Sequence, residues 1–271
     1  MISELQKPLS SGFNAKSESL DVLKDIDLNG KTAIVTGGYS GIGFDTTKGL
    51  VSAGAEVIIP AKRTEIAAQN LDGIVAKENI IKMDLGDLSS VSKFADSFKE
   101  NYKKLDLLIN NAGTNIALGP LTDLSPEQFD KMFQVNLRGP WYLASRIAPI
   151  MAATGGGSII NILSVAALRP PAYNGFYAAT KSGLEAITKV MAQEWANDKI
   201  RVNAIAPGPY RSDLVDSSIA AIPGFEEGMR DSTLLKRIAE TDEILKPVFY
   251  LASDGNITGT TLIADGGLTA S

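Results

Sequence analysis

Residues 32–43 read T-A-I-V-T-G-G-Y-S-G-I-G, a short β-branched run that passes directly into a glycine-rich turn. Gly37, Gly41 and Gly43 have the spacing G-x-x-x-G-x-G, and residues 41–53 can form a helix that stops at Gly54. Glycines let the backbone turn sharply and approach a pyrophosphate, and the start of the helix offers free N–H groups and the positive end of its dipole. This order of elements predicts a nucleotide-binding site, and a turn that binds nothing is the alternative.

The rest of the chain repeats the alternation of strand and helix. Short apolar runs that are typical of strands occupy 56–60, 80–84, 105–110, 158–162, 201–206 and 260–264. Helical patterns occupy 88–101, 177–197 and a long stretch that begins at the cap Ser125 with Pro126. Continuously apolar strands separated by helices predict a parallel sheet that is covered on both faces. We therefore expect an α/β fold, a Rossmann-type doubly wound sheet of seven parallel strands in three α/β/α layers, built as a single domain.

Two segments fall outside this alternation. Residues 1–29 are polar and mixed in charge, and they predict an N-terminal arm that lies on the domain or on a neighbouring subunit. The Rossmann-fold domain is then residues 30–271. Residues 209–240 follow the sixth strand and are more apolar than charged, which predicts a lid over a substrate. Surface helices packed on the core are the alternative for this second segment.

The composition excludes several classes of protein. The 271 residues include no histidine and no cysteine, so a Ser-His-Asp hydrolase, a thiol nucleophile and a Cys/His zinc site are excluded, and we expect no metal. A net charge of −5 without a long basic run argues against nucleic acid. The longest apolar run, 147–153, is far below the about 20 residues that cross a bilayer. We expect no signal peptide, no membrane partner and a cytoplasmic protein.

The end of the second strand bears on the identity of the nucleotide. An acid near this position usually holds the ribose of NAD, whereas an Arg accommodates the 2′-phosphate of NADP. Here the sequence reads P-A-K-R at 60–63, with no acid between Glu56 and Glu65. Lys62 and Arg63 therefore favour NADP(H). NAD(H) remains possible, because two cations at the start of a helix can also be a solvated pair. Asp84, after the third strand, can accept a hydrogen bond from the adenine amine or cap a turn.

The stretch Y-A-A-T-K at 177–181 places a phenol and an ammonium on one face of a helix. A phenol titrates near pH ~10, and a nearby ammonium lowers this pKa, so Tyr177 and Lys181 can perform acid–base chemistry without histidine. Ser164 follows the fifth strand at its carboxyl end, where ligands bind in open α/β sheets, although a strand-end cap is the alternative. Asn136 lies among apolar helical residues, and a buried Asn needs partners, which suggests a structural or relay role.

Together these motifs resemble the short-chain dehydrogenase/reductase family in its compact single-domain branch, and the resemblance covers residues 28–267. Beyond residue 110 the chain is most similar to 3-oxoacyl reductases and sugar-acid dehydrogenases. The resemblance implies that Tyr177 donates or accepts the substrate proton and that Lys181 lowers its pKa and binds the nicotinamide ribose. It also implies that Ser164 hydrogen-bonds the reacting oxygen and that Asn136 holds a water between Lys181 and solvent. The motifs are T-G-G-Y-S-G-I-G at 36–43, Asp84, N-N-A-G at 110–113, Asn136, Ser164, Y-A-A-T-K at 177–181 and P-G-P-Y-R-S at 207–212.

The same resemblance implies a set of residues that bind the cofactor. After the fourth strand the cofactor is supported by Asn110, Ala112 and Gly113, and Ser212 stands where the family often has Thr. The expected cofactor-binding residues are Gly37, Tyr39, Ser40, Gly41, Ile42, Gly43, Lys62, Arg63, Asp84, Leu85, Asn111, Ala112, Gly113, Tyr177, Lys181, Pro207, Gly208 and Ser212.

We therefore expect an oxidoreductase that transfers hydride between NADP(H), with NAD(H) as the alternative, and a small-molecule secondary alcohol or ketone. A catalytically silent NADP-binding sensor or scaffold is the alternative, and an epimerase or dehalogenase on the same fold is a third. Single-domain members of the family are commonly homotetramers or homodimers, and residues 125–153 and 177–197 are the expected contact helices.

Overall fold

Seven parallel strands form the centre of the molecule. The computed structural model describes residues 26–212, 215–216, 219–220, 223–253 and 255–271. The strand order is β3-β2-β1-β4-β5-β6-β7, so the chain starts in the middle of the sheet and winds first to one edge and then to the other. The predicted doubly wound, single-domain α/β fold is confirmed. The strands are β1 (Thr32–Val35), β2 (Glu56–Ala61), β3 (Ile80–Lys82), β4 (Leu107–Asn110), β5 (Gly157–Ile162), β6 (Ile200–Pro207) and β7 (Thr261–Ala264).

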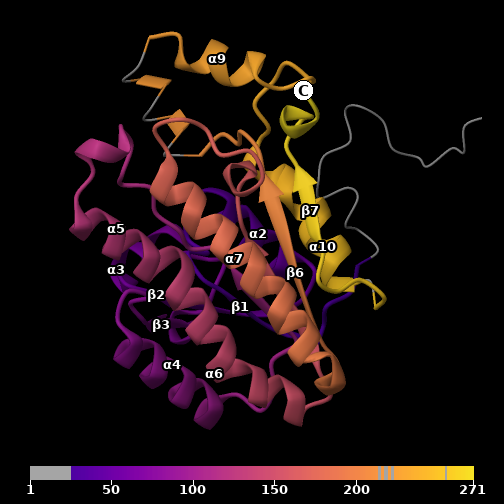
Figure 1. Ribbon diagram of the computed structural model, residues 1–271. Helices are drawn as coiled ribbons and strands as arrows, with labels where there is room; N and C mark the ends of the chain where they lie inside the picture. The colour runs from indigo at the N-terminus through magenta and orange to yellow at the C-terminus, as the bar shows by residue number, and fades with distance from the viewer. Residues whose placement is uncertain (1–25, 213–214, 217–218, 221–222, 254) are drawn as a thin grey trace, which may run out of the picture.

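Helices cover both faces of the sheet and complete the three layers (Figure 1). One face carries α4 (Leu88–Asn101), α6 (Gly139–Ala153) and α7 (Gly175–Glu194). The other face carries α2 (Gly41–Ser52), α3 (Thr64–Asn70) and α10 (Leu245–Ser253). Within β1, Ile34 belongs to the core of the first face and Val35 to the core of the second. Burial on both sides explains why the strands are apolar throughout instead of alternating.

The long helix predicted from Ser125 is divided in two. Its first part is α5 (Pro126–Phe133), and a π-helical turn, η3 (Gln134–Arg138), joins it to α6. Ser125 caps α5 as predicted, because its hydroxyl accepts a 3.3 Å hydrogen bond from the backbone N–H of Gln128. Pro140 has no N–H, so the carbonyl of Asn136 has no donor four residues later and the regular ladder is interrupted. Residues 126–153 are helical throughout, as predicted, and the π-helical turn within this stretch was not predicted.

The remaining elements are short, and most of them lie in the connections between strands. The helix α9 (Phe225–Asp231) lies above the carboxyl end of the sheet (Figure 1). The sequence pattern did not reveal α10, which is short and contains Pro247. The 3-10 turns are η1 (Lys77–Asn79), η2 (Leu121–Asp123), η4 (Val165–Ala167), η5 (Ala196–Asp198), η6 (Thr241–Ile244) and η7 (Leu268–Ala270).

The predicted arm and lid are only partly within the described residues. Of the arm, Ile26 and Leu28 pack against the core, and the N–H of Leu28 donates to the carbonyl oxygen of Ala53 at 2.7 Å. Residues 1–25 of the arm and 213–214, 217–218 and 221–222 of the lid lie outside the described residues. The described part of the lid includes α9 and a bridge between Tyr210 and Ala239.

The part of the chain that the structure describes contains no helix of the length and apolar character needed to span a membrane. The same part contains no group of three acidic side chains placed to hold a metal ion.

Candidate active site

The glycine-rich turn at 36–43 connects β1 to α2. Gly37 and Gly41 have φ angles of 64° and 50°, in the left-handed region that glycine adopts without a steric penalty. A Cβ at Gly43 would overlap the Asn111 amide nitrogen and the carbonyl oxygen of Gly37. The three predicted glycines are therefore required by the backbone itself.

The N-terminus of α2 opens on this turn. Ser40 is the extended N-cap, and its side chain makes no capping hydrogen bond to any described residue. The first-turn N–H groups and the helix dipole are therefore available to an anion. Tyr39 and Ile42 are partly exposed beside the turn, and the carbonyl oxygen of Tyr39 accepts a 3.0 Å hydrogen bond from Asn70. This cradle fits the pyrophosphate of a dinucleotide.

Hydrogen bonds behind the turn tie the end of β1 to the end of β4. The Thr36 hydroxyl accepts hydrogen bonds of 3.0 Å from the backbone N–H groups of Asn111 and Ala112. The Asn111 amide in turn donates to the carbonyl oxygens of Thr36 and Gly37, at 3.0 and 3.2 Å. Asn110 is buried and donates to Asn161 on β5 at 2.9 Å. The N-N-A-G motif thus holds the phosphate turn in shape.

Lys62 and Arg63 are exposed at the end of β2. The Lys62 ammonium lies 2.7 Å from the Asp84 carboxylate, which follows β3. Burial raises the pKa of Asp84, but hydrogen bonds from Lys62 and from the Gly86 N–H outweigh it and hold that pKa below its ordinary value. Leu85 is buried next to Asp84. The residues predicted for the adenosine end therefore lie together, with Lys62 and Asp84 paired.

Tyr177 and Lys181 lie one turn apart on α7 and face Ser164 at the end of β5. The hydroxyls of Ser164 and Tyr177 are hydrogen-bonded to each other. Ser164 also accepts a 3.2 Å hydrogen bond from the Ala166 N–H, so it is a strand-end cap as well. The Lys181 ammonium lies 5.7 Å from the centre of the Tyr177 ring. The structure therefore brings the three predicted catalytic side chains together.

Burial controls the protonation of both titratable groups. Burial raises the pKa of the Tyr177 phenol above its ordinary value, while the hydrogen bond with Ser164 acts in the opposite direction. Burial also lowers the pKa of Lys181 to about 8. The ammonium donates to the carbonyl oxygen of Ile162 at 2.8 Å. In this state burial dominates the pKa of Tyr177, and the lowering expected from Lys181 is not observed.

Asn136 lies in the π-helical turn and is fully buried beside Lys181. Its side chain forms two 2.8 Å hydrogen bonds with the backbone of Thr114, one to the N–H and one to the carbonyl oxygen. A Cβ on Gly113 would lie 3.4 Å from the Lys181 nitrogen and 3.5 Å from the Asn136 oxygen. These are ordinary contact distances, so Gly113 lies directly beside both side chains.

The loop after β6 closes the nicotinamide end of the predicted site. A Cβ on Gly208 would lie 2.6 Å from the Cα of Asp265, so this glycine permits close contact with the chain after β7. A Cβ on Gly41 would lie 3.5 Å from the Cβ of Ser212. The P-G-P-Y-R-S stretch therefore folds back over the start of α2.

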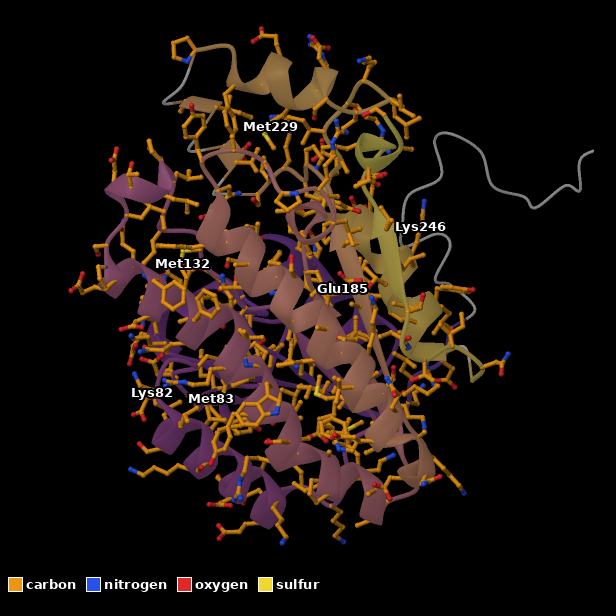
Figure 2. The ribbon with its side chains drawn as sticks, in the orientation of Figure 1. Lys82, Met83, Met132, Glu185, Met229 and Lys246 are labelled. Atoms are coloured by element: carbon orange, nitrogen blue, oxygen red, sulfur yellow. The ribbon has the colours of Figure 1, made fainter. Side chains whose placement is uncertain are left out.

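A cavity of about 240 Å³ joins these groups. The predicted residues that line it are Ile42, Asn111, Gly113, Ser164, Tyr177, Lys181, Pro207, Gly208 and Ser212. The lid contributes Tyr210, Val215 and Met229, and Figure 2 shows Met229 on α9 above the sheet. The cavity is also lined by residues that the sequence analysis did not name: Thr114, Asn115, Ile162 and Leu163. Their only signal in the sequence is position, because the first two follow the N-N-A-G motif after β4 and the last two precede Ser164 at the end of β5.

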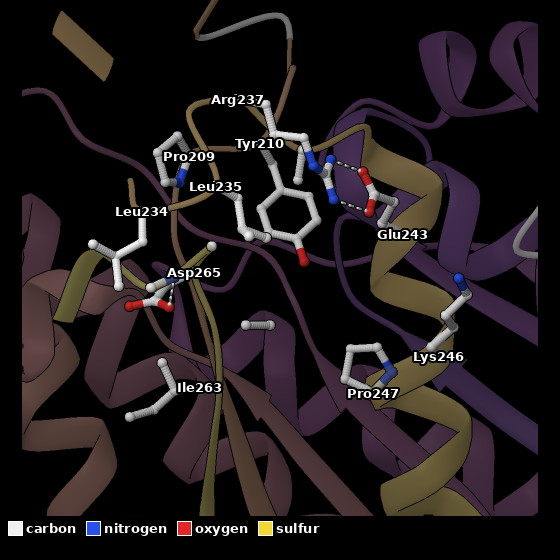
Figure 3. A pocket seen from close by; sticks show the side chains of 14 residues that line it. Pro209, Tyr210, Leu234, Leu235, Arg237, Glu243, Lys246, Pro247, Ile263 and Asp265 are labelled. Atoms are coloured by element: carbon white, nitrogen blue, oxygen red, sulfur yellow. Dashed lines mark hydrogen bonds and ion pairs between the residues drawn. The ribbon is translucent and has the colours of Figure 1, made fainter. Parts of the chain in front are cut away.

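A second cavity of about 500 Å³ shares Pro209 and Tyr210 with the first (Figure 3). Leu234, Leu235 and Ile263 give it apolar walls, and Arg237 and Glu243 form an ion pair beside it with N–O distances of 2.5 and 2.7 Å. Burial, with the nearby Glu243 carboxylate, raises the pKa of Tyr210 to about 12. The predicted catalytic residues Ser164, Tyr177 and Lys181 line the smaller cavity and not this one.

The fold and the site define a dinucleotide-dependent class of oxidoreductases. The chain belongs to the short-chain dehydrogenase/reductase family, because the family model described as enoyl-(acyl carrier protein) reductase matches residues 37–269. Members of the family bind NAD(P)(H).

Individual relatives match over nearly their full length. The NAD-dependent glycerol dehydrogenase of Listeria innocua is 32% identical, with 91% of this chain and 96% of that protein covered. The 3-oxoacyl-[acyl-carrier-protein] reductase of Thermotoga maritima is 31% identical, with 89% and 98% covered. A solved structure of ElxO with NADP bound has a TM-score of 0.81 at 26% identity, with 89% and 99% covered.

Proposed function

We propose that this chain is an NADP(H)-dependent oxidoreductase that interconverts a secondary alcohol and a ketone, with Tyr177 as the acid–base group. One observation carries the proposal. Ser164, Tyr177 and Lys181 converge on a single cavity, and Ile42 of the phosphate turn lines the same cavity. A cavity that joins a dinucleotide cradle to a proton donor is what hydride transfer with coupled proton transfer requires.

The residues of the chain divide the chemistry among them. A bound nicotinamide would supply or accept the hydride, and the protein would place the substrate and move its proton. In reduction, the Tyr177 hydroxyl donates its proton to the carbonyl oxygen, and the Ser164 hydroxyl donates a hydrogen bond to the same oxygen. The raised pKa of Tyr177 supports this direction, because the phenol stays protonated at neutral pH. In oxidation the same groups act in reverse.

Lys181 supplies positive charge beside the phenol. With a pKa of about 8 it is mostly cationic at neutral pH, and a cation at this distance stabilises the phenolate that forms when Tyr177 gives up its proton. Asn136 holds the backbone of Thr114 and sits beside Lys181. Its own carbonyl cannot receive the α-helical hydrogen bond from residue 140, because Pro140 has no N–H. We assign to that carbonyl the water that returns a proton through Lys181.

The cofactor preference rests on the end of β2. Lys62 and Arg63 stand where NAD-dependent folds usually have an acid, and cations attract the 2′-phosphate of NADP. ElxO, which binds NADP, supports the same assignment, whereas the glycerol dehydrogenase is NAD-dependent. Gly37, Gly41 and Gly43 would hold the pyrophosphate in either case.

The test is turnover of NADPH and NADH, side by side, against a panel of ketones, keto acids and sugars. We expect NADPH-dependent reduction of at least one carbonyl class. Tyr177→Phe should lower kcat/KM by about 10²–10⁴-fold, which is the contribution of general acid–base catalysis. Fluorescence titration should show that Tyr177→Phe still binds NADPH. Undiminished turnover in the variant would contradict the role of Tyr177, and cofactor binding without reduction of any carbonyl would contradict the reaction.

We also propose that copies of the chain assemble into a homotetramer or homodimer. Trp141 on α6 and Val190 on α7 are 41% and 48% exposed, and both belong to the predicted contact helices. Exposed apolar side chains on packed helices are typical of self-contacts. Gel filtration with light scattering should give a multiple of 28.7 kDa, and a monomer at working concentration would contradict the proposal.

A further inference from the structure

Four exposed apolar side chains lie next to the catalytic cavity, and we call them the apolar rim. Ile116, Leu118, Leu121 and Tyr173 are 49%, 65%, 62% and 66% exposed. Single exposed apolar residues are ordinary on protein surfaces, but a group beside a cavity marks a binding surface.

The rim joins two segments that are distant in sequence. The N–H of Gly119, within the loop after β4, donates to the carbonyl oxygen of Tyr173, just before α7, at 2.9 Å. The Leu121 side chain packs so closely on Gly175 that a Cβ there would lie 2.6 Å from it. The rim is therefore one continuous structure across the loop and the start of α7.

The rim begins where the catalytic cavity ends. Asn115 lines the cavity, and its amide donates to the Asn174 side chain at 3.1 Å. Ile116 follows Asn115 directly, and Tyr173 precedes Asn174 directly. Tyr177 lies four residues after Tyr173, in the first turn of α7. A molecule that is longer than the cavity and has one end at the Tyr177 hydroxyl would therefore have its other end beside the rim.

The backbone of Tyr173 gives a second indication of function. Its φ angle is 65°, in the left-handed region that a bulky side chain rarely adopts. Such conformations are concentrated at binding and catalytic sites. Here it places a large aromatic ring in solvent beside the cavity, where burial of that ring by a ligand would be favourable.

We propose that the apolar rim receives an apolar tail of the substrate. The substrates are then ketones and secondary alcohols in which a chain of several carbons, or an aromatic group, extends from the reacting carbon. The inference rests on the proposed function. The cavity of about 240 Å³ takes the reacting end, and its wall nearest the rim, Thr114 and Asn115, is polar. Apolar contact for a tail is therefore available on the rim.

The first experiment is a chain-length series of 2-butanone, 2-hexanone and 2-octanone with NADPH. In the wild-type protein kcat/KM should rise by about two- to fourfold for each methylene that becomes buried. The double variant Ile116→Ser/Leu118→Ser should lose most of this rise and keep its rate on 2-butanone. Because both side chains are exposed, stability should change little. A merely structural role for the loop would lower the rates on all three ketones together.

Tyr250→Ser is the matched control. Tyr250 is 50% exposed, similar to Ile116, but it lies on α10, which covers the other face of the sheet from α7. This variant should keep the wild-type dependence on chain length. Calorimetric binding of the same ketones to the NADP⁺-saturated protein provides a readout that does not depend on turnover.

The outcomes separate this inference from the proposed function. Chain-length-dependent binding without turnover, lost in the double variant, would support the rim and overturn the reductase. Turnover of ketones with no dependence on chain length in rate or binding would overturn the rim alone. A double variant that keeps the dependence but loses its oligomeric mass in gel filtration would also overturn it, because the rim would then be a contact between copies.

Discussion

The nucleotide side and the substrate side of this site are built in different ways. On the nucleotide side the backbone sets the geometry: the positive φ angles of Gly37 and Gly41, the close approach at Gly43, and the bonds between Thr36 and Asn111. On the substrate side the walls are side chains on long connections, namely the apolar rim and the chain after Gly208.

The difference follows from what each side must recognise. A pyrophosphate is one fixed shape and is bound through N–H groups, so one backbone conformation serves every member of a family. A substrate is distinguished by its apolar area and its hydroxyls, which exposed side chains can match without changes to the fold. Substitutions should therefore have different consequences on the two sides.

On the nucleotide side the largest effect is expected at Gly43. The added methyl group of Gly43→Ala overlaps the Asn111 amide and the carbonyl oxygen of Gly37, which belong to the same hydrogen-bonded turn. Overpacking of this kind costs about 1–3 kcal/mol, so the Kd for NADPH should rise by about 10- to 100-fold. Fluorescence titration of NADPH measures this change directly.

Gly228→Ala is the matched change on the substrate side. Gly228 lies within α9, and a Cβ there would meet no described atom within 4 Å. Alanine is the better helix former by about 0.5–1 kcal/mol, so thermal stability should be unchanged or slightly higher and NADPH binding should stay the same. Equal losses of NADPH affinity in the two variants would remove the distinction between the two sides.

The exception on the nucleotide side is Lys62 and Arg63, which would recognise the cofactor through side chains. Neutralising both, together with Ala61→Asp, should lower kcat/KM for NADPH by about tenfold or more, because charge-assisted hydrogen bonds to the 2′-phosphate are lost. The rate with NADH should be retained or increased. The ratio of the two kcat/KM values is the readout, and an unchanged ratio would show that other residues choose the cofactor.

The backbone-determined side was also the side that the sequence predicted best. The glycine spacing at 37–43 and the Y-A-A-T-K motif are local patterns, and their positions after a strand and on a helix supply the rest. The π-helical turn at Asn136 was not predicted, because one of its causes, Pro140, is local but the other is a contact with a distant segment. Thr114, which is 22 residues away, binds the Asn136 side chain, and Pro140 removes a ladder donor.

The substrate side was harder for a related reason. Leu118 and Leu121 are apolar residues in a loop, and an apolar pattern alone assigns such residues to a core. Their exposure depends on how the loop packs on the start of α7, through Gly119, Tyr173 and Gly175. Likewise, the pairing of Lys62 with Asp84 joins neighbouring strands and could not be derived from either segment alone.

The pH dependence of kcat/KM should not distinguish the nucleotide side from the substrate side. Reduction requires the Lys181 cation, whose pKa burial lowers to about 8. As the pH rises through this value the cation is lost, so kcat/KM for reduction should fall, by about tenfold at pH 9 relative to pH 7. The fall should be the same for short and long ketones, because Lys181 acts at the reacting end, which the two kinds of ketone share. Lys181→Arg, which keeps its charge, should be less active and lack this limb; a persisting limb would assign the titration to another group.

The smallest effects are expected at two helix caps. Asp87 caps α4 by accepting a 2.9 Å hydrogen bond from the Ser89 N–H, and Ser125 caps α5 by accepting one from Gln128. Loss of either cap in Asp87→Ala or Ser125→Ala should lower Tm by about 2–4 °C.

Only the second cap is connected to the substrate. Gln128 completes the capping box with Ser125 and also donates from its side chain to the carbonyl oxygen of Ile116 at 3.2 Å, so it supports the apolar rim. Ser125→Ala should therefore weaken the preference for 2-octanone over 2-butanone by about twofold, a shift of less than 1 kcal/mol, whereas Asp87→Ala should leave it unchanged. Parallel melting curves and ketone ratios would separate stability from recognition. If both variants shifted the ketone ratio equally, the rim would respond to general loosening of the fold and not to its own supports.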